Sequence, residues 1–137
     1  MKEELAVIRA YLDLQKIRFG ERLSWEFRID KKCELLELPP MLFHQLVENA
    51  VKHGVEKQTA HSTIVMEGLS ENGHLTLRVM NQGTLSETSF RGLGLQSIKD
   101  ELEGLYGDKA SFTIMKGKEN IVVAEISLPV PDSFYQL

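Results

Sequence analysis

One stretch of the chain joins a strong helix signal to a dense set of polar groups: Pro39-Pro40-Met41-Leu42-Phe43-His44-Gln45-Leu46-Val47-Glu48-Asn49-Ala50-Val51-Lys52-His53-Gly54. Proline suits the first turn of a helix, where its missing amide hydrogen is not needed. Gly54 is a typical stop signal, so we expect the helix to end near Lys52 or His53. At 100° per residue, apolar side chains fall on one face and polar ones on the other, within an arc of roughly 140°. The polar face carries Gln45, Glu48, Asn49, Lys52 and His53.

This polar face has two interpretations, an ordinary solvated surface or part of a site for a metal ion and a nucleotide. Mg²⁺ prefers oxygen ligands and bridges phosphate oxygens with only one or two protein contacts, and Asn49 offers one neutral oxygen. Lys52, one turn later, can place a positive charge against phosphates. Glu48 can act as a base or orient a ligand. His53 can contact phosphate, or it can pack at the helix end.

A second feature is Arg91-Gly92-Leu93-Gly94-Leu95, which stands directly before an apolar pattern that predicts a third helix closing at Gly107. A helix N-terminus presents free amide hydrogens, and glycines let a phosphate approach them closely. The same pattern also suits the end of a flexible loop. Residues 82–93 are rich in Gly, Ser and Thr and lack periodicity, so we expect a loop long enough to act as a lid.

A third feature is Val79-Met80-Asn81-Gln82-Gly83, where a predicted strand runs into that loop. A polar side chain at the end of a buried strand can hydrogen-bond the edge of a purine, and the following glycine leaves room for the ring. An Asn-x-Gly turn without a ligand fits the pattern equally well.

Around these features the sequence predicts an α+β fold. Apolar residues at helical spacing predict a helix within residues 3–23, and Asn72-Gly73 favours a tight turn between two strands. The predicted strands are 25–29, 62–69, 74–81, 110–115 and 121–128. This order of elements predicts a two-layer sandwich, in which about three helices cover one face of a mixed, mostly antiparallel sheet.

The totals fit one globular domain. The chain has 137 residues, of which 42% are hydrophobic and 26% are charged, as is ordinary for a single-core protein. A net charge of −4 gives no electrostatic reason to expect a nucleic-acid partner. The single cysteine, Cys33, cannot form an internal disulfide, which favours a reducing, cytosolic setting. No apolar run approaches the ~20 residues needed to cross a bilayer, so we expect no direct membrane contact by this segment.

Taken together and in this order, the three features resemble the ATP-binding domain shared by histidine kinases, gyrases and MutL, called the Bergerat fold. The narrower likeness is to the LytS-like sensor kinases. Residues 39–54 look like that family's asparagine box almost residue for residue, and residues 92–107 are similar to its second glycine box and the following helix. Tyr11, Arg18-Phe19 and Leu23 match the helix that leads into the catalytic domain of these kinases.

The resemblance implies a division of the chain and a set of site residues. Residues 1–23 would be a helix that continues from a dimerisation and phosphoacceptor region, residues 24–130 the catalytic domain and residues 131–137 a tail. Asn49 would hold Mg²⁺. The residues implied at the nucleotide are Asn49, Lys52, His53, Asn81, Gly83, Gly92, Leu93, Gly94 and Leu95. The residues implied in catalysis are Glu48, Asn49 and Lys52.

The activity implied is protein-histidine kinase activity, in which the γ-phosphoryl group of magnesium ATP moves to a histidine on a dimerisation domain absent from this chain. None of the four histidines lies in a segment that resembles the family's phosphoacceptor region. The implied partners are a second copy of the parent protein and a cognate response regulator. The implied location is the cytoplasmic side of an inner-membrane sensor.

Two positions bear on the choice among activities. Asn81 stands where most relatives carry Asp, which removes the charge that strengthens the hydrogen bond to adenine by about 1 kcal/mol. This departure, with Thr84-Leu85 in place of a second glycine, favours the alternative of a degenerate, non-catalytic nucleotide-binding or interaction module. Gln45 stands where ATP-hydrolysing members of the fold carry a basic glutamate, which favours phosphoryl transfer over hydrolysis.

The first helix leaves one question open. Leu5, Ile8 and Leu12 can pack on this domain, or they can continue into a coiled coil between two copies of the parent protein.

Overall fold

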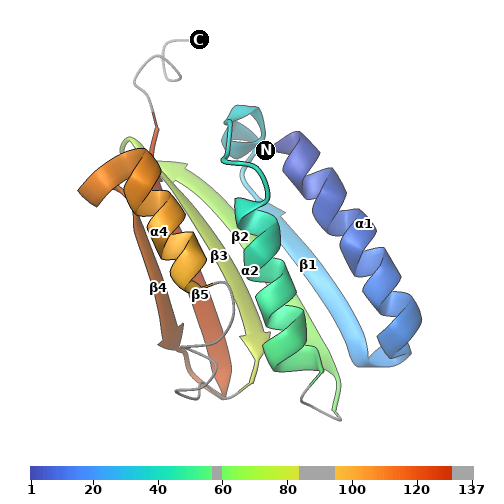
Figure 1. Cartoon of the computed structure of the whole chain (residues 1–137). Helices are drawn as coiled ribbons and strands as arrows, with labels where there is room; N and C mark the ends of the chain where they lie inside the picture. The colour runs from blue at the N-terminus through green and yellow to red at the C-terminus, as the bar shows by residue number, and fades with distance from the viewer. Residues whose placement is uncertain (57–59, 84–94, 131–137) are drawn as a thin grey trace.

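The computed structural model describes residues 1–56, 60–83 and 95–130, and these residues form a helical layer packed on one sheet (Figure 1). The sheet has five strands in the order β1-β2-β3-β5-β4. Their bounds are β1 (Leu23–Ile29), β2 (Ser62–Glu71), β3 (His74–Gln82), β4 (Ser111–Lys116) and β5 (Ile121–Pro129). β1 and β2 are parallel, and every other pair is antiparallel. The predicted mixed, mostly antiparallel sheet is confirmed.

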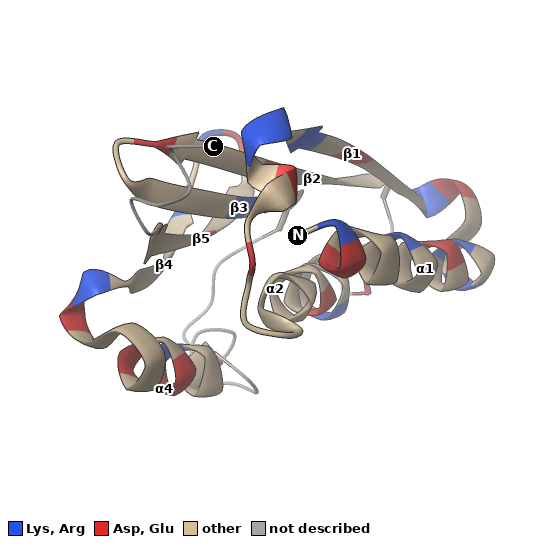
Figure 2. Cartoon of the chain, turned by 90° about the horizontal axis from the view of Figure 1, so that it is seen from above, with Lys and Arg blue, Asp and Glu red and all other residues tan. Residues whose placement is uncertain are grey.

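Within residues 1–56, 60–83 and 95–130, three helices cover one face of this sheet, in agreement with the prediction. They are α1 (Lys2–Phe19), α2 (Leu42–Ala50) and α4 (Leu95–Tyr106). Seen from above, all three lie on the same side of the strands (Figure 2). Short helical turns connect the elements: η1 (Gly20–Arg22), η2 (Lys31–Leu35), η3 (Val51–Val55) and η4 (Gly107–Lys109). No helix in the described part of the chain is long and apolar enough to span a membrane.

The predicted turn at Asn72-Gly73 forms, and a second hairpin joins β4 and β5. Asn72 and Gly73 have φ values of 52° and 79°. Two successive positive φ values define the type of turn that matches the twist of the flanking strands. Glu119 and Asn120 adopt 55° and 59° in the second turn. The turn chemistry is local, so the sequence alone was enough to predict it.

Helix α1 packs on this domain, which answers the question left open by the sequence. Leu5, Ile8 and Leu12 are at most 4% exposed and belong to the same core as the buried residues of α2 and the sheet. Helix α1 and turn η1 occupy nearly all of the predicted leading segment, 1–23. The predicted tail, 131–137, lies outside the described residues.

Helix α1 also caps α2. The predicted start of α2 at the prolines is two residues early, because Met41 adopts a left-handed φ of 67° and the helix begins at Leu42. None of the residues at this end supplies a side-chain cap. Instead the two carboxylate oxygens of Glu4 accept hydrogen bonds from the N–H groups of Met41 and His44, each at 3.1 Å. A carboxylate at this position also suits the positive end of the helix dipole.

The prediction that α2 ends near Lys52 or His53, with Gly54 as its stop signal, is wrong. The α-helix ends at Ala50 and continues as the wider η3 turn, Val51–Val55, so Gly54 does not stop it. A Cβ on Gly54 would lie 2.2 Å from Nδ2 of Asn81 on β3. Gly54 therefore lies where two segments approach closely, and a larger residue there would force the Asn81 side chain or the backbone to move.

We expect Glu4→Gln to destabilise the fold by about 1 kcal/mol, because the charge-assisted cap of α2 is lost. Urea unfolding followed by circular dichroism measures this. Glu3→Gln is the matched control, since Glu3 is exposed in the same first turn. Equal midpoints for the two variants would contradict the role of Glu4.

Candidate functional site

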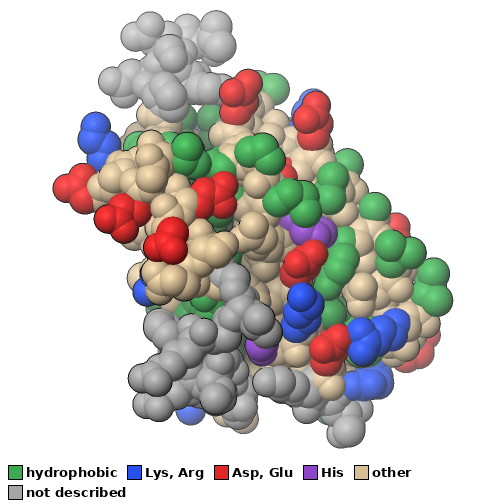
Figure 3. Space-filling view, viewed as in Figure 1, with side chains coloured by type: hydrophobic (Ala, Val, Ile, Leu, Met, Phe, Trp, Pro, Cys, Tyr) green, Lys and Arg blue, Asp and Glu red, His purple; other side chains and the backbone are tan. Residues whose placement is uncertain are grey.

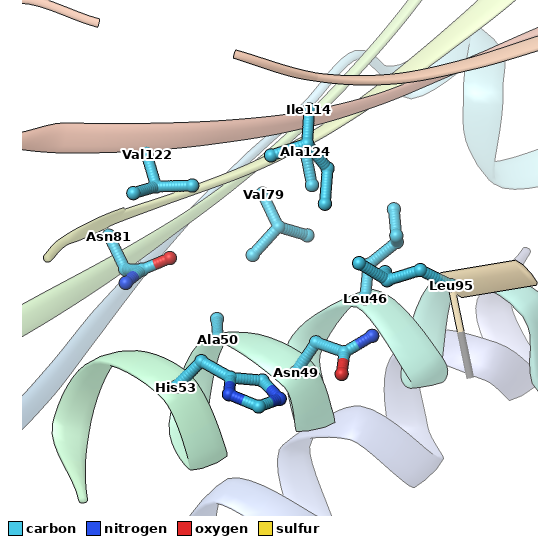
Figure 4. Close-up of a pocket in the computed structure, with 10 residues that line it drawn as sticks. All are labelled: Leu46, Asn49, Ala50, His53, Val79, Asn81, Leu95, Ile114, Val122 and Ala124. Carbon is cyan, nitrogen blue, oxygen red and sulfur yellow. The ribbon is translucent and has the colours of Figure 1, made fainter. Parts of the chain in front are cut away.

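A pocket lies between α2, the start of α4 and the sheet (Figure 4). Its walls are mostly apolar. The residues that line it are Leu46, Asn49, Ala50, His53, Val79, Asn81, Leu95, Ile114, Val122 and Ala124. They come from six elements, α2, η3, β3, α4, β4 and β5, and three of the predicted site regions meet here.

Asn49 and His53 reach the pocket from α2 and η3. Leu46 and Ala50 lie on the same side of the helix, as residues three, four and seven apart do. The predicted separation into an apolar and a polar face is therefore incomplete, because polar Asn49 and His53 share the pocket wall with apolar residues. An amide beside apolar groups suits a ligand with a flat ring and a polar tail.

Asn81 faces Asn49 from the end of β3, and its orientation follows from one hydrogen bond. Nδ2 of Asn81 donates to the backbone carbonyl of Gln82 at 2.9 Å. Because a carbonyl oxygen only accepts, the atom facing it must be the amide nitrogen. The amide oxygen of Asn81 is thus turned toward the pocket (Figure 4). Asn81 as a whole is only 8% exposed, and its amide oxygen is an acceptor that a ligand's N–H group in the pocket could reach.

The predicted glycines have different outcomes. Gly83 is buried and its N–H donates to the carbonyl of Asn120 at 2.8 Å, but it does not line the pocket that the described residues form. Leu95 lines the pocket as the first residue of α4. Gly92, Leu93 and Gly94 lie outside the described residues, as does most of the predicted lid.

Glu48 and Lys52 do not line this pocket. Glu48 accepts a hydrogen bond from Nε2 of His44 at 2.8 Å, and the His44 side chain is 6% exposed. The ring of Tyr11 on α1 meets His44 edge-on at 4.9 Å. Burial first, and the carboxylates of Glu48 and Glu56 next, raise the pKa of Tyr11 to about 12. The structure thus places Glu48 on the side of α2 that faces α1, while Lys52 is exposed.

His44 is the residue near this site that the sequence interpretation missed. Its spacing of four from Glu48 was a visible signal, since residues at i and i+4 are neighbours on a helix.

No model of a known protein family matches this chain. It is 32% identical over 123 residues to the sensor protein LytS of Staphylococcus haemolyticus, covering 80% of this chain and 21% of that protein. It is 25% identical to the sensor histidine kinase BtsS of Escherichia coli K12, covering 96% of this chain and 24% of that protein. The chain thus spans only about a quarter or less of the length of these relatives.

Solved structures agree on the fold. The catalytic domain of the histidine kinase ThkA in a nucleotide-free form superposes with a TM-score of 0.70 at 19% identity, covering 93% of this chain and 90% of that one. The Acinetobacter baumannii histidine kinase AdeS gives 0.69 at 12% identity, covering 96% of this chain and 65% of that one.

The fold is therefore that of a histidine kinase catalytic domain. Within that class, the chain is a relative of the LytS-type sensor proteins, as the asparagine box indicates.

We expect Gly54→Ala to destabilise the domain by about 1–3 kcal/mol, because its Cβ would overlap Asn81 and the two segments would have to separate. Gly104→Ala is the matched control, since a Cβ there meets nothing within 4 Å. That change in α4 should stabilise the protein by roughly 0.5–1 kcal/mol. Thermal unfolding of both variants shows whether the melting temperature falls for Gly54→Ala and rises for Gly104→Ala, as expected. A neutral Gly54→Ala would mean that the contact with Asn81 is not a tight one.

Proposed function

We propose that this chain is the ATP-binding catalytic domain of a two-component sensor histidine kinase. In this proposal the γ-phosphoryl group of magnesium ATP is transferred to a histidine on a dimerisation domain that is not within these 137 residues. The observation that carries the proposal is the pocket with two amides, Asn49 and Asn81, on opposite sides of an apolar interior, within a histidine kinase fold.

The pocket residues fit a purine nucleotide. Val79, Val122 and Ala124 form an apolar wall from the sheet, which suits the face of a base. The amide oxygen of Asn81 can accept a hydrogen bond from an exocyclic amine, which distinguishes adenine from guanine at that edge. The hydrogen bond to Gln82 already holds this amide in the accepting orientation.

The phosphates would extend along α2 toward α4. Asn49 would contribute a neutral oxygen to a Mg²⁺ ion, and bound magnesium ATP would supply the electrophilic phosphoryl group. His53 lines the pocket and would contact the nucleotide, while exposed Lys52 would add positive charge outside it. Gly92, Leu93, Gly94 and Leu95 would receive the phosphates at the N-terminus of α4. Gly83 would support Asn81 from the adjacent turn.

The catalytic contribution of these residues would be positioning and charge neutralisation. Glu48 has a carboxylate held by His44 rather than turned into the pocket, so a role as base would apply to the acceptor histidine arriving from outside. The chain alone is expected to bind nucleotide without phosphorylating itself.

The partners and location proposed are those of such a sensor. They are a dimerisation and phosphoacceptor domain in a homodimer, a response regulator, and a position on the cytoplasmic side of a membrane. One solved neighbour is ThkA in complex with the response regulator protein TrrA, with a TM-score of 0.71, 16% identity and coverage of 96% of this chain and 40% of that one. That complex supports the idea of a response-regulator partner.

The competing proposal is a non-catalytic nucleotide-binding or interaction module of the same fold. It is favoured by Asn81, which stands where most relatives have Asp. However, the donor of Asn81 fits the carbonyl of Gln82, an arrangement that a carboxylate could not make. Calorimetric titration with a nonhydrolysable ATP analogue decides between the proposals. No heat at millimolar nucleotide would favour the module.

Asn49→Ala should remove the magnesium-dependent part of analogue binding, because the metal loses its protein ligand. The measurement compares titrations with magnesium and with excess chelator. Thr113→Ala, on an exposed position of β4, is the control and should keep the wild-type difference. Magnesium dependence that survives in Asn49→Ala would contradict the assignment of this ligand.

Asn81→Leu should weaken analogue binding about tenfold or more, both with and without magnesium, since one buried hydrogen bond of roughly 1–2 kcal/mol is lost. The effect of Asn49→Ala on analogue binding should therefore depend on magnesium, whereas the effect of Asn81→Leu should not. An Asn81→Leu variant that discriminates between ATP and GTP analogues as the wild type does would contradict base recognition by Asn81.

A further inference from the structure

Helix α1 is apolar on two opposite sides. Its core side carries the buried residues Leu5, Ile8, Leu12 and Phe19. The opposite side carries a second set, which we call the outer stripe: Val7, Ala10, Leu14 and Ile17, all exposed. Val7, Leu14 and Ile17 are 44%, 64% and 83% exposed. Hydrophobic side chains gather along the α1 side of the molecule in Figure 3.

The spacing of the outer stripe is that of a coiled-coil seam. Its members follow one another at steps of three, four and three residues, which places Val7 and Leu14 at a positions and Ala10 and Ile17 at d positions. A single exposed apolar residue is ordinary, but a contiguous row marks a contact surface. Since the core side of α1 is already packed against the domain, the outer stripe offers a second surface on which another helix can pack.

Charges beside the stripe indicate which helix this is. Asp13 falls at a g position and Arg18 at the next e position. In a parallel pair, a g residue faces the e residue five positions later on the other helix, so Asp13 would meet Arg18 of a second copy on both sides of the seam. In an antiparallel pair, the two Asp13 carboxylates would face each other.

Arg18 remains able to make this contact. Its side chain is 62% exposed while it pairs with Glu56 at 2.6 Å, and a guanidinium has five N–H donors. The charges beside the outer stripes of two copies are therefore complementary when the two helices are parallel.

We propose that α1 forms a parallel, in-register contact with α1 of a second copy of this chain through the outer stripe. The stripe is only about 15 Å long, which is short for a stable interface, so the isolated chains would associate weakly. Tethering would strengthen the contact by raising the effective concentration. This part rests on the proposed function, because the dimerisation domain of a sensor kinase would provide the tether.

Disulfide trapping tests the contact in this chain. In a parallel pair, Leu14→Cys places two thiols at equivalent a positions, within reach of a disulfide. Under mild oxidation, the Leu14→Cys dimer should form at least several-fold faster than that of Leu105→Cys, a control on α4 where the native side chain is 58% exposed. Native Cys33 should not interfere, because it is buried and burial raises its pKa to about 11. Equal rates for the two variants would overturn the proposal.

Second-site changes test the seam and its orientation. In the Leu14→Cys background, Ile17→Gln should slow trapping several-fold, whereas Leu35→Gln, at an exposed residue outside α1, should not. Asp13→Arg should slow trapping, and Asp13→Arg combined with Arg18→Asp should restore it. A double variant as slow as the single one would overturn the parallel arrangement.

The experiment contains no nucleotide, so its failure is distinct from failure of the proposed function. All of these variants should bind the ATP analogue as the wild type does. Loss of trapping with intact binding would therefore overturn only the contact between copies.

Discussion

Helix α2 is held at both of its ends by side chains or backbone from other elements. At the N-terminal end, the carboxylate of Glu4 accepts two backbone hydrogen bonds. At the other end, Gly54 allows the η3 turn to approach Asn81 on β3. Asn49 and His53 project from the segment between these two contacts. The geometry of the pocket therefore depends on one contact outside it, at Glu4, and on one at its edge, where Gly54 meets Asn81.

Among the described residues that line the pocket, none carries a carboxylate, ammonium or guanidinium group. Its polar groups are two amides and an imidazole, and its other walls are apolar. The charged residues of α2 and η3 lie elsewhere, with Glu48 paired to His44 and Lys52 exposed. Under the proposed function, this arrangement would separate recognition of a base, inside the pocket, from charge compensation outside it. Such a division suits phosphoryl transfer, in which the protein mainly positions its reactants.

The sequence predicted those parts of the structure whose causes are local. The Asn72-Gly73 turn follows from two residues that tolerate positive φ, and the convergence of Asn49, Asn81 and Leu95 was implied by the family resemblance. The end of α2 was not predictable in this way, because the reason for Gly54 lies on another strand. The cap by Glu4 was not predictable either, because Glu4 lies on a different helix from the amide groups that it binds.

Helix α1 shows a different limit of sequence reasoning. Its apolar residues satisfy helical periodicity on two opposite sides, and a search for one amphipathic face finds only Leu5, Ile8 and Leu12. Burial in the structure separates the two sets. The placement of Glu48 was missed because helical spacing alone does not say whether a carboxylate faces the ligand or a neighbouring helix.

The carboxylate of Glu4 also limits how far the polypeptide can be shortened. A version that began at β1 would keep every residue that lines the pocket, yet the first turn of α2 would have no acceptor for its amide groups. The same truncation would expose the apolar surface that α1 covers. The smallest stable unit therefore includes a helix that contributes no residue to the lining of the pocket.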